Sequence, residues 1–394
     1  MHCRHLATII VCWAALANAT WAAPGGEFRF APLRPTAAAT GSRTTEWRRA
    51  ALPPSVDRAA LEALAATYFT SSPTSGPGRT LALVLAQHGA IVYERYAKDI
   101  VCTQVLHTMS VAKMMGAVMA GLLVADGKLK LDAPVSFPEW PPGDPRRAIT
   151  ARNLLTMTSG LRWRDPADFL EFAFGDASRD LAHYVASQPL EFSPGTHFAY
   201  SDGTPSLIGA LLKREVGGRR QDVARFMRDR LFTPLGMTRT QLEFDLQGTW
   251  YGSSGVRWSP CDLARFGEFL LRDGTWAGAR YLPEGWVNFM RTPSGASLTQ
   301  ALPPGMSEEE RLPYGAFTFV FDLTPAAITA RARTPLTIDA FGHEGFGGSL
   351  LRVVPSHEAV LVIVAEGVHE DAQRSAIAKQ LTDSLMLEPI SSVP

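Results

Sequence analysis

Short apolar runs typical of β-strands gather at the two ends of the chain. Residues 80–97, TLALVLAQHGAIVYERYA, hold two such runs around His88-Gly89, which predicts a hairpin with a tight turn. Three more strands are predicted near the other end, over residues 314–323, 348–355 and 359–366. Strands from both ends of the chain are therefore expected to share one sheet.

Apolar positions at helical spacing predict a helix over residues 55–69, with Ser55 as its N-cap, and a closing helix over 370–386. Helical patterns and loops fill the middle of the chain. This distribution predicts an α/β fold, with an antiparallel sheet flanked by N- and C-terminal helices and an inserted, mainly helical lobe. The expected lobes are 51–128 plus 312–394 (α/β) and 129–311 (helical).

The first 23 residues have the pattern of a signal peptide. Arg4 precedes the short apolar run LATIIVCWAALA, and small residues follow at Ala17 and Ala19. The alternative is an uncleaved anchor, although the run is short for a membrane span. Residues 24–50 lack periodicity and are expected to form a flexible leader. The prediction is a periplasmic or secreted protein without a membrane span in its mature chain.

The composition indicates a soluble globular protein. The 394 residues are 46% hydrophobic, and 38 basic residues balance 38 acidic ones. Zero net charge gives no reason to expect nucleic acid or an anionic membrane as a partner. Of the four cysteines, Cys3 and Cys12 would leave with the signal peptide, while Cys102 and Cys261 would stay. Whether these two pair cannot be deduced from sequence, because it gives no distance between them.

One lysine interrupts an apolar helical pattern over residues 105–127. Ser110 lies three residues before Lys113, so on a helix the two side chains share a face. A lysine in apolar surroundings loses its proton more easily, and an uncharged amine can then take the proton of a serine hydroxyl. The pair therefore predicts a nucleophile beside its base. The alternative is a surface lysine that snorkels out of a half-buried helix.

Two later segments add polar groups that suit the same chemistry. Tyr200 lies just before a helix expected near Thr204, where a phenol can shuttle a proton; a packed tyrosine is the alternative. Glycines are concentrated in residues 342–348, GHEGFGG, where they let a substrate approach backbone N–H groups. This segment lacks the H-E-x-x-H pattern, so no metal is expected, and no cofactor is implied.

These three segments together resemble the serine penicillin-recognising enzymes. Ser110-Val-Ala-Lys113, Tyr200-Ser-Asp202 and His343-Glu-Gly345 match the three motifs of that family in their order along the chain. The resemblance is strongest to the class C beta-lactamase-like branch of esterases, D-aminopeptidases, DD-peptidases and 6-aminohexanoate-dimer hydrolase. Phrases such as LLTMTSGL and PLGMTRT extend it over residues 56–366.

The resemblance implies a role for each matched residue. Ser110 would be the acylated nucleophile, Lys113 its base and Tyr200 the proton shuttle. The oxyanion donors would be the backbone N–H groups of Ser110 and Phe346, the residue after Gly345. The second motif can also be matched one residue later, as Ser201-Asp-Gly, which resembles the S-D-N motif of class A beta-lactamases and would make Ser201 the proton shuttle. The class C-like phrases elsewhere in the chain favour Tyr200.

Two positions depart from the family pattern. Asp202 stands where Asn or Ser is usual, and it could hold Lys113 or a substrate amine. His343 stands where many beta-lactamases have a lysine that binds the substrate carboxylate. The sequence therefore predicts a hydrolase of a small-molecule ester, amide or peptide. A DD-peptidase or weak beta-lactamase is one alternative, and a non-catalytic binding protein on the same fold is another. Loops over 163–180, 250–258 and 292–312 are expected to shape the cleft.

Overall fold

The computed structural model describes most of the chain between the predicted leader and the predicted closing helix. The described residues are 33, 46–54, 56–69, 79–302, 311, 313–321 and 340–367. The predicted signal peptide, most of the leader and the predicted helix over 370–386 lie outside them.

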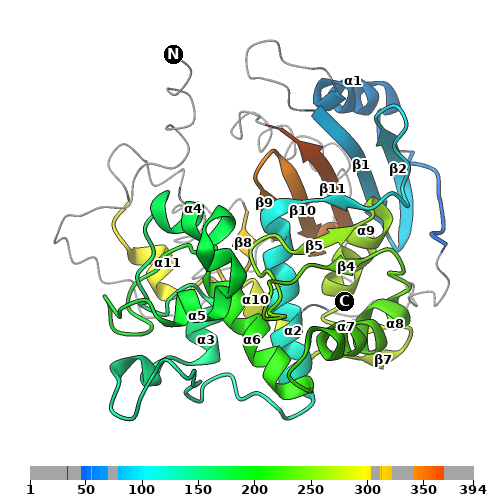
Figure 1. Ribbon diagram of the computed structural model, residues 1–394. Helices are drawn as coiled ribbons and strands as arrows, with labels where there is room; N and C mark the ends of the chain where they lie inside the picture. Colours follow the sequence, from blue (N-terminus) through cyan, green and yellow to red (C-terminus); the bar gives the residue numbers. More distant parts are fainter. Residues whose placement is uncertain are drawn as a thin grey trace, which may run out of the picture.

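A six-stranded antiparallel sheet forms one half of the molecule (Figure 1). Its strand order is β2-β1-β11-β10-β9-β8, so the N-terminal hairpin and the four C-terminal strands meet where β1 pairs with β11. The strands are β1 (Arg79–Gln87), β2 (Ala90–Tyr96), β8 (Phe319–Val320), β9 (Phe341–Gly345), β10 (Ser349–Val354) and β11 (Ala359–Glu366). The predicted sheet from both chain ends is thus confirmed, including the hairpin turn, where His88 and Gly89 both have positive φ.

Both faces of the sheet are buried, which explains why β1 and β11 read as unbroken apolar runs. On one face, Leu83, Leu85 and Leu361 pack with the apolar side of α1 (Arg58–Phe69). The opposite face joins a larger core that also contains α2 (Lys113–Ala125) and α9 (Pro260–Leu271).

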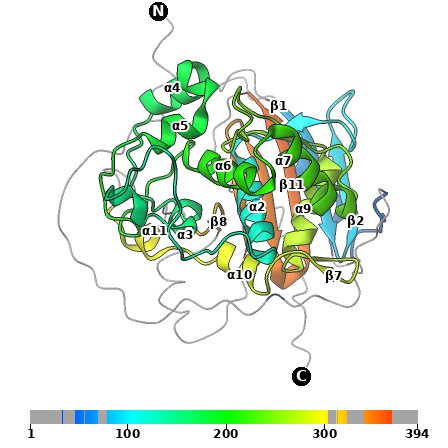
Figure 2. The ribbon, with the colours of Figure 1, turned by 60° about the horizontal axis from the view of Figure 1, so that its bottom comes forward.

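Helix α2 lies at the centre of the molecule, between the sheet and the helical lobe (Figures 1 and 2). Eleven of its thirteen residues are buried, as expected for a helix that is apolar all round. The helices of the middle segment, besides α9, are α3 (Ala151–Leu155), α4 (Ala167–Phe174), α5 (Leu181–Ala186), α6 (Thr204–Val216), α7 (Arg220–Met227), α8 (Thr233–Leu235), α10 (Trp286–Met290) and α11 (Gly295–Thr299).

The middle segment is not wholly a helical lobe, which corrects the predicted boundary of 129–311. Helix α9 lies in that range but packs on the sheet, with Phe266 and Phe269 fully buried. Three short strands pair in a second sheet beside it: β3 (Leu106–His107), β5 (Val256–Trp258) and β4 (Gln241–Leu242). Two more, β6 (Thr275–Trp276) and β7 (Ala279–Arg280), form a small hairpin. Helical periodicity shows which face is apolar but not which surface it covers.

Two local predictions at the N-terminal side need correction. The carboxylate of Asp57 accepts the N–H groups of Ala59 and Ala60, at 2.9 and 3.0 Å, so Asp57 caps α1 in the place predicted for Ser55. The indole of Trp47 donates to the carbonyl of Cys261 at 3.0 Å. The packed chain therefore begins before the predicted end of the leader at residue 50.

Cys102 and Cys261 form a disulfide, which settles the alternative that the sequence left open. Their Cα atoms are 5.2 Å apart, although 159 residues separate them in sequence. The bridge joins the segment that leads into β3 to the start of α9. It fixes the stretch that precedes Ser110 against the sheet half of the molecule.

Within the described ranges, no helix combines the length and the apolar character that a membrane crossing requires.

Replacing both disulfide cysteines, as Cys102→Ala with Cys261→Ala, is expected to lower the free energy of unfolding by about 2–5 kcal/mol, because the bridge closes a long loop in the unfolded chain. Urea unfolding with and without dithiothreitol measures this. The reductant should destabilise the wild type and leave the double variant unchanged. Equal unfolding midpoints for oxidised wild type and double variant would contradict the assignment.

Candidate active site

The predicted nucleophile lies in a strained turn at the base of the central helix. Ser110 belongs to a 3₁₀ turn, Met109–Ala112, that continues directly into α2. Met109 has φ 51°, in the left-handed region that side chains rarely adopt. The hydroxyl of Thr108 accepts the indole N–H of Trp258 at 2.6 Å, a buried contact that holds the chain just before the turn. Strain maintained by packing next to a reactive group is common at active sites.

Strand β9 lies against the turn that carries Ser110. A Cβ atom on Gly345 would be 2.0 Å from the carbonyl oxygen of Thr108, so only glycine permits this approach. The strand therefore places Phe346, which follows Gly345, at the end of β9 beside the nucleophile's turn. The oxyanion roles of the Ser110 and Phe346 N–H groups stay predictions.

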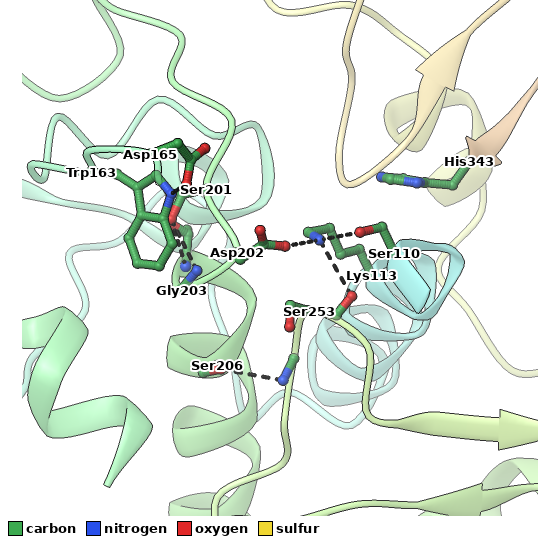
Figure 3. Close-up of polar contacts among 12 residues, drawn as sticks. Ser110, Lys113, Trp163, Asp165, Ser201, Asp202, Gly203, Ser206, Ser253 and His343 are labelled. Carbon is green, nitrogen blue, oxygen red and sulfur yellow. Dashed lines mark hydrogen bonds and ion pairs between the residues drawn. The ribbon is translucent and has the colours of Figure 1, made fainter. Parts of the chain in front are cut away.

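Lys113 is fully buried and contacts three oxygen atoms (Figure 3). Its Nζ is 2.9 Å from Ser110 Oγ, 2.5 Å from Asp202 Oδ1 and 3.3 Å from the carbonyl oxygen of Ser253. An ammonium has three N–H donors, one for each oxygen. An uncharged amine would donate to Asp202 and Ser253 and turn its lone pair to the Ser110 hydroxyl. The same geometry thus serves both protonation states.

The expectation of an uncharged Lys113 in the resting protein is wrong. Burial alone lowers the pKa of the amine, but the negative charge of Asp202, supported by Tyr200, outweighs burial and raises the pKa above its ordinary 10.5. Lys113 is therefore an ammonium at neutral pH. The apolar helix around it was visible in the sequence, whereas its partner Asp202 is 89 residues away.

Tyr200 faces both members of the serine–lysine pair. Lys113 Nζ lies 4.9 Å from the centroid of the tyrosine ring. Burial raises the pKa of the phenol, and hydrogen bonding to Ser110 and Lys113 only partly offsets it, so the hydroxyl keeps its proton at neutral pH. A protonated phenol in this position can donate to a leaving group.

The alternative proton shuttle, Ser201, does not fit the geometry of the site. The hydroxyl of Ser201 accepts the N–H groups of Gly203 and Thr204, both at 3.1 Å, at the start of α6. Figure 3 shows it on the side of Asp202 away from Lys113. The Ser201 hydroxyl therefore holds the backbone at the start of α6.

The loop over residues 251–255 lies in one of the segments expected to shape the cleft and belongs to the site, but the sequence did not show which of its groups takes part. It contributes the Ser253 carbonyl that contacts Lys113, and the N–H of Gly252 donates to Ser206 on α6 at 3.2 Å (Figure 3). The only sequence signal was a pair of glycines around two serines. Every residue has a backbone carbonyl, so a contact made by one cannot be recognised from the residue type.

His343 is buried and uncharged. Its Nδ1 lies 2.6 Å from the carbonyl oxygen of Glu344, which can only accept, so Nδ1 carries the proton. Its Nε2 then accepts the hydroxyl of Tyr314 at 3.3 Å. Burial and the nearby charge of Lys113 lower the pKa of His343 to about 3. This position therefore supplies no cation for a substrate carboxylate.

A loop of the helical lobe brings one more carboxylate to the site. The indole of Trp163 donates to Asp165 at 3.0 Å, and the same ring packs against Gly203, where a Cβ atom would be 2.7 Å from it. Burial and the negative charge of Asp202 raise the pKa of Asp165 to about 6. The sequence placed this loop at the cleft but did not single out Asp165.

Within the described ranges, no group of three or more His, Cys, Asp and Glu side chains is arranged to hold a metal ion.

Serine–lysine pairs replace the commoner serine–histidine pairs in one class of acyl-transferring hydrolases. The family model named Beta-lactamase matches residues 66–384, so the chain belongs to the beta-lactamase family. The predicted family resemblance is confirmed.

Curated relatives match over part of their length. Esterase EstB from Burkholderia gladioli is 31% identical over 183 residues, which cover 39% of this chain and 44% of the relative. Lovastatin esterase from Penicillium rubens is 31% identical over 160 residues, or 35% of this chain and 39% of the relative. The chain thus matches less than half the length of either esterase.

A solved structure matches over nearly its whole length. The protein named as a 6-aminohexanoate-dimer hydrolase from Bacillus anthracis has a TM-score of 0.67 at 17% identity, covering 91% of this chain and 90% of that one. This likeness confirms the predicted fold.

Replacing the anionic partner of the lysine, as Asp202→Asn, is expected to lower the pKa of Lys113 below 10.5, because burial then prevails. A titration followed by NMR of ¹³C-labelled lysine side chains measures it, with Lys113→Ala to assign the signal. Asp229→Asn, an exposed carboxylate far from the site in sequence, is the control and should leave the titration unchanged. A wild-type Lys113 that titrates below 10.5 would contradict this electrostatic account.

Proposed function

We propose that the protein is an exported serine hydrolase that cleaves a small ester or amide through an acyl-enzyme on Ser110. The observation that carries the proposal is the 2.9 Å contact between Ser110 Oγ and a lysine amine shielded from solvent. Tyr200 faces the same pair, and the family membership supports the chemistry. A non-catalytic binding protein would have no need of this geometry.

Acylation begins with a proton shift inside the buried ion pair. Lys113 passes one proton to Asp202 across their 2.5 Å contact and becomes an amine. Because the pair rests ionised, this transfer is uphill and forms part of the barrier to acylation. The amine takes the Ser110 proton as Oγ bonds to the substrate carbonyl carbon. Tyr200 then gives its proton to the leaving group and regains one from Lys113.

Water then hydrolyses the acyl-enzyme through the same groups. The amine of Lys113 takes a proton from water while the water oxygen bonds to the acyl carbon. The bond between that carbon and Ser110 Oγ breaks, and Lys113 returns the proton to the serine. Asp202 finally gives its proton back to Lys113, which restores the resting ion pair.

The charge at the third motif favours esters and simple amides over beta-lactams. The family resemblance assigns His343 to the place of a carboxylate-binding lysine, and here the imidazole is neutral. Beta-lactam antibiotics and peptide C-termini carry a carboxylate that would lack its cation. A DD-peptidase or weak beta-lactamase is the second candidate, supported by the family membership.

Export to an oxidising compartment is part of the proposal. The disulfide between Cys102 and Cys261 supports it, because such bridges persist in the periplasm and outside the cell. The signal-like N-terminal pattern points the same way. Mass spectrometry of the protein purified from its native cells should find the N-terminal residues removed; an intact, reduced cytoplasmic chain would refute export.

A fluorophosphonate probe should label Ser110, and Ser110→Ala should lower hydrolysis of a short-chain p-nitrophenyl ester by at least about 10³-fold. Ser136→Ala, which changes an exposed serine outside the site, is the matched control and should retain activity. A chromogenic cephalosporin assayed beside the ester tests the second candidate. Label on another residue refutes the mechanism, and a clear preference for the cephalosporin reverses the ranking.

A further inference from the structure

Strand β4 leaves one edge of the second sheet unpaired. The order of that sheet is β3-β5-β4, so β4 has a neighbouring strand on one side only. Glu243 bonds to that side: its N–H donates to the carbonyl of Gly255 at 3.0 Å, and its carbonyl accepts the N–H of Tyr251 at 2.9 Å. Adjacent residues of an antiparallel strand direct these groups the other way. The backbone N–H and carbonyl groups of Leu242 and Phe244 therefore point to the open edge, where no described residue bonds to them.

A cavity of about 410 Å³, the β4 groove, lies along this edge. The strand side contributes Leu242 and Phe244 to its lining, and the helical side contributes Ala224 and Arg228. The buried ring of Phe232 also lines it and makes part of it apolar. Figure 1 shows β4 in the same part of the molecule as α7 and α8. The volume falls within the range of about 300–1,000 Å³ that is usual for ligand sites.

The helical wall of the β4 groove is basic. Helix α7 and the π turn that follows it, Arg228–Phe232, hold four arginines and two aspartates. Arg220 and Arg225 pair with no carboxylate in the described part of the chain. Arg228 pairs with its neighbour Asp229 through Nε alone, and both side chains are exposed. Water weakens such a pair, and the other guanidinium nitrogens keep their N–H groups for a ligand.

Two of these arginines are placed along the groove. Arg220, Ala224 and Arg228 follow at intervals of four residues, so they share one face of the helical segment. Ala224 and Arg228 line the groove. A Cβ atom on Gly248 would be 3.2 Å from the Cβ of Arg220, which places Arg220 at the turn beyond Phe244. The basic wall therefore extends over the length of the open edge.

Glu243 does not neutralise this wall. Its carboxylate binds Arg257 at 2.6 Å and His107 at 3.2 Å, both on the neighbouring strands. Successive side chains of a strand point to opposite faces, so Glu243 lies on the face away from Leu242 and the groove. The groove therefore combines unpaired backbone groups, an apolar lining and an excess of positive charge.

We propose that the β4 groove binds an extended acidic peptide segment of another protein, which adds a strand to the free edge of β4. The peptide backbone bonds to Leu242 and Phe244, alternate side chains lie on the apolar lining, and acidic side chains meet Arg220 and Arg228. An anionic acyl chain would fill the lining but leave the strand's N–H groups without acceptors, so the peptide fits better. This binding function is separate from the chemistry proposed at Ser110.

Three fluorescein-labelled heptapeptides test the proposal in fluorescence polarisation with the whole protein. The acidic probe is Ser-Glu-Val-Glu-Val-Glu-Ser amide, the basic probe has lysine in place of glutamate, and the third is the acidic probe with both valines N-methylated. The acidic probe should bind at least about tenfold more tightly than the basic one. N-methylation should weaken binding by about tenfold, because the valines that face the lining carry the N–H groups that bond to β4.

Single substitutions locate the bound peptide. Arg228→Glu reverses one charge of the groove and should weaken binding of the acidic probe by about fivefold or more. Leu242→Pro removes an outward N–H, leaves the bonds to β5 in place and should also weaken binding. The matched control Arg179→Glu reverses an exposed arginine of the helical lobe and should bind as the wild type does. Circular dichroism confirms that each variant is folded.

Equal affinity for the acidic and basic probes overturns the proposal, as does acidic-probe binding that survives both N-methylation and Arg228→Glu. Displacement of the acidic probe by dodecanoate at a lower concentration than by unlabelled acidic peptide would assign the groove to an anionic amphiphile. A dimer in sedimentation experiments that Arg228→Glu dissociates would assign it to a second copy of this chain. Either result refutes a peptide of another protein as the occupant.

Discussion

The buried ion pair between Lys113 and Asp202 is the constraint on which the site depends. A lysine sealed inside an apolar helix would lose its charge or destabilise the fold if it stood alone. The carboxylate removes that penalty and sets the direction of the lysine's N–H groups. Ser110 and the Ser253 carbonyl take the two remaining directions, so one pair of charges aligns the proposed nucleophile, its proposed proton acceptor and the loop over residues 251–255.

The two halves of the fold each supply part of this arrangement. The sheet half provides the strained turn of Ser110 and the strand that ends at Gly345, and the disulfide ties the approach to that turn to α9. The helical half provides Tyr200, Asp202 and the loop of Asp165. A site between two such units can change substrate through its loops while the acylating groups stay fixed. Here the uncharged His343 offers a substrate carboxylate no cation.

The sequence predicted the sheet, the central helix and the Ser110–Lys113–Tyr200 set because each follows from local pattern or from matched motifs. It misjudged what depends on contacts between distant residues. The charge state of Lys113 is set by Asp202, which no helical period reveals. Ser253 contacts Lys113 through its backbone carbonyl, which residue type does not reveal. Helix α9 lies within the segment predicted as the helical lobe, yet it packs on the sheet.

The central claim is that Lys113 rests as an ammonium held by three oxygens. A neutron crystal structure of the deuterium-exchanged resting protein at neutral pH tests it most directly. The account predicts three deuterons on Nζ, directed at Ser110 Oγ, Asp202 Oδ1 and the Ser253 carbonyl. Two deuterons on Nζ, with the Ser110 deuteron pointing at the nitrogen, would contradict it.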